Sequence, residues 1–100
     1  MASLTLTEAA KGDLKNIARF TQSRWNREQR NNYLKILDSN FCQLANNPAM
    51  GMACNEIKAG YYKFPAESHM IFYRKRADQK IEIVRVLHKS MDVEIQLSKS

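Results

Sequence analysis

Two histidines and several cations give this 100-residue sequence the residue types that cleave RNA without a metal. Such cleavage needs a group that activates the 2′-hydroxyl, an acid for the leaving oxygen and cations for the developing negative charge. The candidates for acid and base are His69 and His88, and the candidates for holding phosphate are Lys63, Arg74 and Arg85. The sequence therefore contains the parts of a ribonuclease site, although their spacing does not show that they meet.

The same residues have structural interpretations. A histidine at the end of a predicted strand, as at His88, more often makes local hydrogen bonds than performs catalysis. Arg74 and Arg85 could hold strand ends or pair with Glu82 and Asp92. Both interpretations stay open at the level of the sequence.

Binding is the second chemistry that the sequence offers. Residues 71–92, IFYRKRADQKIEIVRVLHKSMD, contain apolar and β-branched residues that alternate with cations. A sheet built from them is apolar enough to pack against helices and basic enough to meet an anionic surface. The net charge of +6 also predicts a polyanionic or acidic partner, either nucleic acid or an acidic protein segment.

Two helices are expected in the first half of the chain. Thr7 precedes an acidic first turn and predicts a helix from about residue 8, and Asn26 begins a capping box with Gln29. A short connection between the helices predicts an antiparallel hairpin. The predicted core faces are Leu14, Ile17, Ala18, Thr21 and Trp25 on the first helix, and Leu34, Leu37, Phe41, Leu44 and Ala45 on the second.

Strands are expected before and after the helices. Leu4-Thr5-Leu6 predicts an edge strand with both leucines inward, and residues 48–60 read as a loop. Three further strands are predicted at 61–64, ending at Pro65, then at 69–76 and at 80–88. Along the last strand, Ile81, Ile83, Arg85 and Leu87 are assigned to one face, and Glu82, Val84, Val86 and His88 to the other. Residues 89–100 are expected to form a short helix or a tail.

The length and composition predict one compact domain spanning residues 1–100. The predicted helices and strands give it the α+β class and the order β-α-α-β-β-β. Charged residues among the first twenty exclude the apolar core of a signal peptide, and no apolar run approaches a membrane span, so we expect a cytoplasmic protein without a membrane partner. Cys42 and Cys54 are expected to be reduced thiols. The sequence shows no pattern for a metal site, a cofactor or a small-molecule substrate.

Four segments together resemble the ParE/RelE toxin superfamily of bacterial toxin–antitoxin modules, and most closely its ParE branch. They are TEAAKGDLKNIARFTQSRW, FCQLANNPAMG, GYYKFPAESHMIFYR and IEIVRVLHKSMD, and the resemblance extends from Leu4 to about Val93. It implies a two-helix hairpin on a small antiparallel sheet. It also implies a cognate, ParD-like antitoxin whose flexible C-terminal segment wraps the toxin, in a hetero-oligomeric complex.

The resemblance leaves the activity open, because one fold serves two functions. ParE-like toxins inhibit DNA gyrase and stop replication, whereas RelE-like toxins cleave mRNA on the ribosome. RelE-like nucleases typically carry a denser group of cations and a catalytic Tyr or His close to the C-terminus. Here Lys89-Ser90-Met91-Asp92 follow His88, so a carboxylate stands where a nuclease needs cations. A third alternative is an antitoxin binder that has lost toxicity.

The sequence therefore favours a type II toxin that inhibits gyrase and has no catalytic residues of its own. The residues predicted to contact the target are Arg74, Lys75, Arg76, Arg85, His88, Lys89, Met91 and Asp92. If the protein were a ribonuclease instead, its catalytic residues would be His88, Arg85, Arg74 and Lys63.

Overall fold

The computed structural model describes residues 4–55, 57–76 and 80–90. A strand and two helices are followed by a 3-10 turn and four strands: β1 (Leu4–Leu6), α1 (Glu8–Arg24), α2 (Arg27–Asn46), η1 (Pro48–Met50), β2 (Met52–Ala53), β3 (Tyr61–Ala66), β4 (His69–Lys75) and β5 (Ile81–His88). The predicted α+β order is confirmed. The segment that was expected to be only a loop contains η1 and β2.

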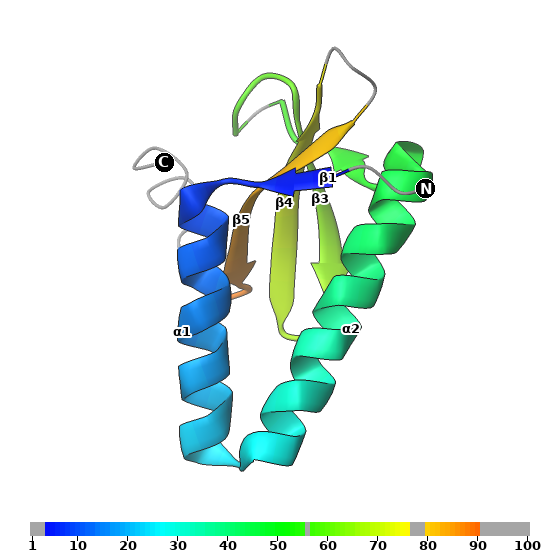
Figure 1. The fold of residues 1–100 in the computed structure, drawn as a ribbon. Coiled ribbons are helices and arrows are strands. Elements are labelled where there is room, and N and C mark those ends of the chain that lie inside the picture. Colours follow the sequence, from blue (N-terminus) through cyan, green and yellow to red (C-terminus); the bar gives the residue numbers. More distant parts are fainter. Residues whose placement is uncertain (1–3, 56, 77–79, 91–100) are drawn as a thin grey trace.

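The five strands form one sheet in the order β1-β5-β4-β3-β2. β1 pairs parallel to β5, and the other neighbours pair antiparallel. α1 and α2 form an antiparallel hairpin that crosses the sheet, with α1 alongside β5 (Figure 1). The main core lies between the helices and the sheet and includes Ile17, Leu37, Phe41, Ile71 and Ile83. A second, smaller cluster gathers around Cys54, Phe72 and Leu87.

Both predicted N-caps are confirmed. The Thr7 hydroxyl accepts a hydrogen bond from the Ala10 N–H at 3.0 Å, and the Asn26 side chain accepts one from the Gln29 N–H at 2.8 Å. Thr7 also ties the start of α1 to the sheet, because its hydroxyl donates to the Val84 carbonyl at 2.7 Å. The Asn26 side chain satisfies a backbone N–H at the start of α2, and this allows the turn at residues 25–26 to be short.

The core assignment of Trp25 is wrong. Its side chain is 70% exposed, whereas Phe41 is buried as predicted. On α1 the buried residues are Ala10 and Ile17, and both lie in the first part of the helix. The hairpin extends beyond the end of the sheet, so the last turns of α1 have no strand beneath them (Figure 1). Helical spacing put Trp25 in line with the core-facing residues, but α1 ends at Arg24 and Trp25 follows it without helical backbone angles.

The predicted alternation along β5 is also wrong beyond Val84. Phe72 pairs with Arg85 but Tyr73 pairs with Ile83, so Val84 is an extra residue in β5 and forms a β-bulge. After an insertion of one residue, the side chains change faces. Val86 accordingly joins Ile83 in the main core, and Leu87 joins Val84 in the second cluster.

β3 continues through Pro65 to Ala66, two residues further than predicted. Ala66 pairs with His69 across a two-residue turn, in which Glu67 has a φ of 57°. Pro65 pairs with Met70, and the short β2 does not reach this part of β3. The missing N–H of proline is tolerated there because this part of the strand is an edge.

Candidate functional site

Three predicted contact residues gather at one end of the sheet, which we call the basic end (Arg74, Lys75 and Arg76). All three are exposed and lie where β4 leads toward β5. The Arg74 Nε donates to the Glu82 carboxylate at 2.7 Å, as one prediction had it. The Lys75 ammonium lies 4.9 Å from the centre of the Tyr62 ring. This end of the sheet thus presents adjacent positive charges to solvent.

Arg85 has a structural environment that differs from the basic end. Its Nε and Nη2 donate to the two oxygens of Asp13 at 2.8 and 2.9 Å, so its partner on α1 replaces the acids considered from the sequence. Both side chains are largely buried. The hydrogen bonds to Asp13 raise the pKa of Arg85 above its usual value, against the opposing effect of burial. The guanidinium is therefore held as part of the contact between α1 and the sheet.

The two histidines meet at the opposite end of the sheet. His69 and His88 are paired across β4 and β5, and their rings stand edge to face with centres 5.3 Å apart. The Tyr33 hydroxyl from α2 lies 2.6 Å from the His69 Nδ1. The Ser90 N–H donates to the His88 Nδ1 at 3.1 Å, which leaves Nε2 as the protonated nitrogen of a neutral ring. We call these four residues the histidine cluster.

The environment of His69 keeps its imidazole neutral. Burial, together with the smaller effect of His88, lowers the pKa of His69 from 6.5 to about 4, and Asp13 opposes both. The Tyr33 hydroxyl accepts the Ser68 N–H at 3.2 Å and is therefore oriented to donate to the His69 Nδ1. A histidine that is neutral and already hydrogen-bonded to a tyrosine serves as a structural link between α2 and β4.

A groove of about 510 Å³ runs beside the histidine cluster, between α1 and the end of β5. Its lining includes the apolar side chains of Ile17, Phe20 and Val86, and Phe20 on its α1 side is 61% exposed. The lining residues are Asp13, Asn16, Ile17, Phe20, His69, Val86, His88 and Ser90. An exposed aromatic ring at the rim of a groove is a feature of surfaces that bind other proteins.

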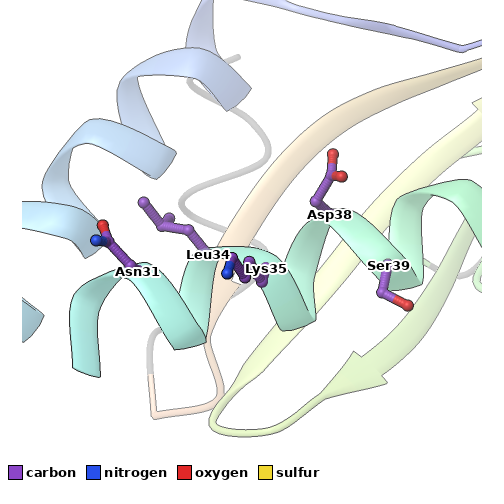
Figure 2. A pocket seen from close by; sticks show the side chains of 5 residues that line it. All are labelled: Asn31, Leu34, Lys35, Asp38 and Ser39. Carbon is purple, nitrogen blue, oxygen red and sulfur yellow. The ribbon is translucent and has the colours of Figure 1, made fainter. Parts of the chain in front are cut away.

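A second groove, of about 400 Å³, lies between the two helices. Its lining combines a floor of aliphatic and aromatic side chains with one cation and one acid at the rim: Leu14, Ala18, Leu34, Leu37 and Phe41, with Lys15 and Asp38. A shallow pocket continues it over the outer surface of α2, where Asn31, Lys35 and Ser39 join the shared Leu34 and Asp38 (Figure 2). The helix pair thus offers an elongated apolar surface with charged edges.

The structure brings together only part of the predicted site: His69 meets His88, but the basic end and Lys63 lie elsewhere. Lys75 pairs with Ile81 at one end of the β4–β5 ladder and His69 with His88 at the other, roughly 20 Å away at 3.3 Å per residue. Lys63 pairs with Phe72, which belongs to the second cluster, so Lys63 is on the sheet face opposite the helices. Lys89 is exposed beside His88, and Met91 and Asp92 lie outside the described residues.

The sequence interpretation missed Asp13 and Tyr33, which hold the candidate residues in place. Asp13 is 72 residues from Arg85 and Tyr33 is 36 residues from His69 in the sequence. The only local signal was a polar residue beside an apolar helix stripe, at Asp13 next to Leu14 and at Tyr33 next to Leu34. Such a signal does not identify the distant partner.

The described residues offer neither a metal site nor a helix that could span a membrane. Residues 4–55, 57–76 and 80–90 contain no group of three or more His, Cys, Asp or Glu side chains placed to hold a metal ion. Within the same ranges, neither helix combines the length and apolar character needed to cross a membrane.

The similarity to known proteins extends over nearly the whole chain. A family model described as the ParE toxin of the type II toxin–antitoxin system, parDE, matches residues 4–93. Toxin ParE1 of Mycobacterium tuberculosis is 42% identical over 92 residues, which make up 92% of this chain and 94% of the relative. Toxin ParE1 of Caulobacter vibrioides is 35% identical over 97% of this chain and 99% of the relative.

Solved structures give the same result for the fold. A chain from the chromosomal ParDE toxin–antitoxin system of P. aeruginosa superposes with a TM-score of 0.76 and covers 88% of this chain and 96% of its own length. Its sequence identity to this chain is 19%, so this likeness concerns the fold alone.

Proposed function

Because the chain belongs to the ParE toxin family of type II toxin–antitoxin systems, we propose that it inhibits DNA gyrase by binding, without catalysis of its own, and that a ParD-like antitoxin blocks it. The chain is the toxin component of such a system, and an antitoxin is its partner. The gyrase target, the absence of catalysis and the class of antitoxin are the proposed parts.

The observation that supports a binding function is the separation of the candidate phosphate-holding cations Arg74 and Lys63 from the two histidines. Arg74 and His88 lie at opposite ends of the sheet, and Lys63 lies on the face opposite the helices. Arg85 is engaged by Asp13 in two hydrogen bonds. A general acid, a general base and a phosphate clamp must lie within a few ångströms of one scissile bond. Residues placed in this way favour a surface that binds over a site that cleaves.

The proposed contacts with gyrase lie at the two ends of the sheet. The basic end supplies Arg74, Lys75 and Arg76, and the other end supplies His88 and Lys89. Met91 and Asp92, which lie outside the described residues, also belong to the proposed contact set. Arg85 supports this surface through its bond to Asp13. Exposed charges of one sign steer association with an oppositely charged partner and fix its orientation.

The proposed antitoxin site is the groove between α1 and α2. Its floor of leucines and Phe41 suits the apolar side of an amphipathic segment, and Lys15 and Lys35 at its edges suit acidic side chains. A flexible acidic segment that folds on binding would bury this surface, and the net charge of +6 would steer its approach. The resulting complex is a hetero-oligomer.

Purified gyrase and supercoiled plasmid test the proposed activity. We expect the protein to inhibit supercoiling and to cause cleaved DNA to accumulate, and its antitoxin to reverse both effects. If active gyrase showed neither inhibited supercoiling nor accumulated cleaved DNA, the proposal would be refuted. Cleavage of messenger RNA in a translating extract, lost in His88→Ala, would instead identify the RelE-like alternative. Antitoxin binding with no effect on gyrase, translation or growth would identify a binder that has lost toxicity.

Calorimetry tests the antitoxin site separately. Burial of the apolar groove predicts a negative heat-capacity change on binding the antitoxin. The Leu34 side chain is only partly buried, and we expect Leu34→Gln to weaken binding by at least tenfold. The control Lys58→Gln, in the connection between β2 and β3, is expected to leave binding unchanged. Equal binding by both variants would remove the groove from the interface.

A further inference from the structure

The connection between α1 and α2 carries a cluster of arginines around an exposed tryptophan, which we call the hairpin tip (residues 19–30). Trp25 is the only tryptophan of the chain and is 70% exposed. All residues from Gln22 to Gln29 are exposed. The hairpin tip projects beyond the sheet and lies away from the basic end (Figure 1). A large aromatic ring in this position has no role in the core.

The hairpin tip concentrates positive charge. Its four arginines, Arg19, Arg24, Arg27 and Arg30, face a single acid, Glu28, which gives a net charge of +3, half the +6 of the chain. Among the salt bridges of the described residues, none involves these arginines. Arg30 donates instead to the neutral amides of Gln22 at 2.7 Å and Asn31 at 2.9 Å. The charges of the hairpin tip are therefore not neutralised within the described part of the fold.

The hairpin tip is also ordered in advance of binding. The backbone N–H of Trp25 donates to the Thr21 carbonyl at 2.9 Å at the end of α1, and the Asn26 side chain caps α2. The bond from Arg30 to Gln22 links the two helices. Arg24 lies 5.6 Å from the centre of the Phe20 ring. A preordered surface loses little conformational entropy when it binds a ligand.

We propose that the hairpin tip binds single-stranded nucleic acid, with an unpaired base stacked on Trp25 and phosphates held by the flanking arginines. An exposed indole accepts the face of any base, and guanidinium groups match the geometry of phosphate. An acidic peptide would satisfy the charge but offers no planar ring for the indole. The inference does not depend on gyrase inhibition, and its test contains no gyrase.

The test uses the intact chain and a twelve-nucleotide oligothymidine. Trp25 is the sole indole, so base stacking is expected to quench the tryptophan fluorescence directly. With a labelled oligonucleotide, we expect Trp25→Ala to weaken binding about tenfold and Trp25→Phe to retain most of it. Trp25 is mostly exposed, and urea denaturation would verify that both variants remain folded.

Salt dependence separates specific phosphate contacts from general charge. We expect Arg24→Gln/Arg27→Gln to reduce the slope of log K against log salt by about 1.4, at roughly 0.7 per phosphate contact on a single strand. The matched control Lys11→Gln/Lys58→Gln removes two exposed lysines elsewhere and is expected to leave the slope nearly unchanged.

Four outcomes would overturn the inference. Equal losses in the arginine pair and the lysine pair would mean that only net charge attracts the strand. Equal quenching of Trp25 by a twelve-residue polyglutamate would identify an acidic protein segment as the ligand class. Binding of oligothymidine with no change in Trp25 fluorescence, or no binding at low salt, would remove the nucleic acid from the hairpin tip.

Discussion

Asp13 on α1 completes the edge of β5 where the pairing with β1 ends. β1 follows β5 only as far as Ile83, and two residues beyond the bulge the Val86 N–H donates to the Asp13 carboxylate at 3.0 Å. The same carboxylate accepts both hydrogen bonds from Arg85. One side chain of a helix thus takes the place of a neighbouring strand and fixes α1 to the sheet.

Asp13→Asn is expected to lower the free energy of unfolding by about 2–4 kcal/mol. The amide can keep part of the hydrogen bonding, but Arg85 would remain largely buried without a counter-charge. Urea denaturation of the two proteins measures the difference. The Val86 N–H would also exchange a charged acceptor for a neutral one.

The exposed pair of Arg74 and Glu82 supplies the matched control. The Arg74 side chain is 53% exposed, so Arg74→Gln is expected to change stability by less than about 1 kcal/mol. Equal losses for Asp13→Asn and Arg74→Gln would contradict the role given to the Asp13–Arg85 contact.

Stability is expected to fall as the pH decreases from about 6.5 to about 4. His69 has a pKa of about 4 in the folded protein and 6.5 as its ordinary value, so the unfolded chain binds more protons in this range. His69 therefore contributes its full stability above pH 6.5 and loses it as the pH falls through the folded pKa. Urea denaturation across this pH range measures the effect.

His69→Asn is the control for the pH effect, because the amide can bond to the Tyr33 hydroxyl but does not titrate. The difference in stability between the original protein and this variant is expected to change between pH 6.5 and 4. In addition, His88→Ala is expected to raise the pKa of His69, measured by NMR titration, because His88 lowers it. A flat difference would refute the linkage.

Gly51→Ala is expected to lower stability by about 1–3 kcal/mol, the range for overpacked sites. A Cβ at this position would lie 2.1 Å from the Tyr73 hydroxyl oxygen and 2.6 Å from its ring. Tyr73 is fully buried and cannot move aside freely. Its hydroxyl donates to the Pro48 carbonyl at 2.6 Å and accepts the Gly51 N–H at 2.9 Å.

A double-mutant cycle with Tyr73→Phe checks this explanation. Loss of the hydroxyl is expected to cost about 1–2 kcal/mol by itself and to relieve part of the clash. The double variant is therefore expected to lose less stability than the sum of the two single variants. Strict additivity would show that the alanine acts through another contact.

Matched charge reversals at the two ends of the sheet test the proposed gyrase contacts. Lys75→Glu and Lys89→Glu are each expected to raise the concentration needed for half-inhibition by at least tenfold, because each reverses an exposed charge on the proposed surface. Lys58→Glu, the same change outside that surface, is expected to have little effect. An unaffected variant would remove its end of the sheet from the contact.

The parts of the fold that the sequence predicted depend on local chemistry. Thr7 and Asn26 act as caps through backbone groups three residues away, and Phe41 repeats with Leu37 and Leu44 at helical spacing. The fate of Trp25 depended instead on where the sheet ends, and the bulge at Val84 depended on the register with β4. Neither property is encoded in a window of neighbouring residues.

The candidate site was less predictable for the same reason. The charged residues of the basic end were visible as a run of three cations, because they are adjacent in sequence. The separation of Arg74 from His88 required the strand pairing, and the engagement of Arg85 required a partner on α1. Sequence alone could thus name the residue types of a ribonuclease without showing that the fold keeps Arg74 and Lys63 apart from the two histidines.

The parallel pairing of β1 with β5 sets the order in which the protein can be completed during synthesis. Leu4 pairs with Ile81, and the Thr7 N–H donates to the Ile83 carbonyl at 3.0 Å. The first strand therefore has no neighbour until the last strand has left the ribosome, and contacts so distant in sequence form slowly. An interrupted translation product lacking β5 cannot assemble the toxin surface, so the cell meets this surface only after β5 has been synthesised.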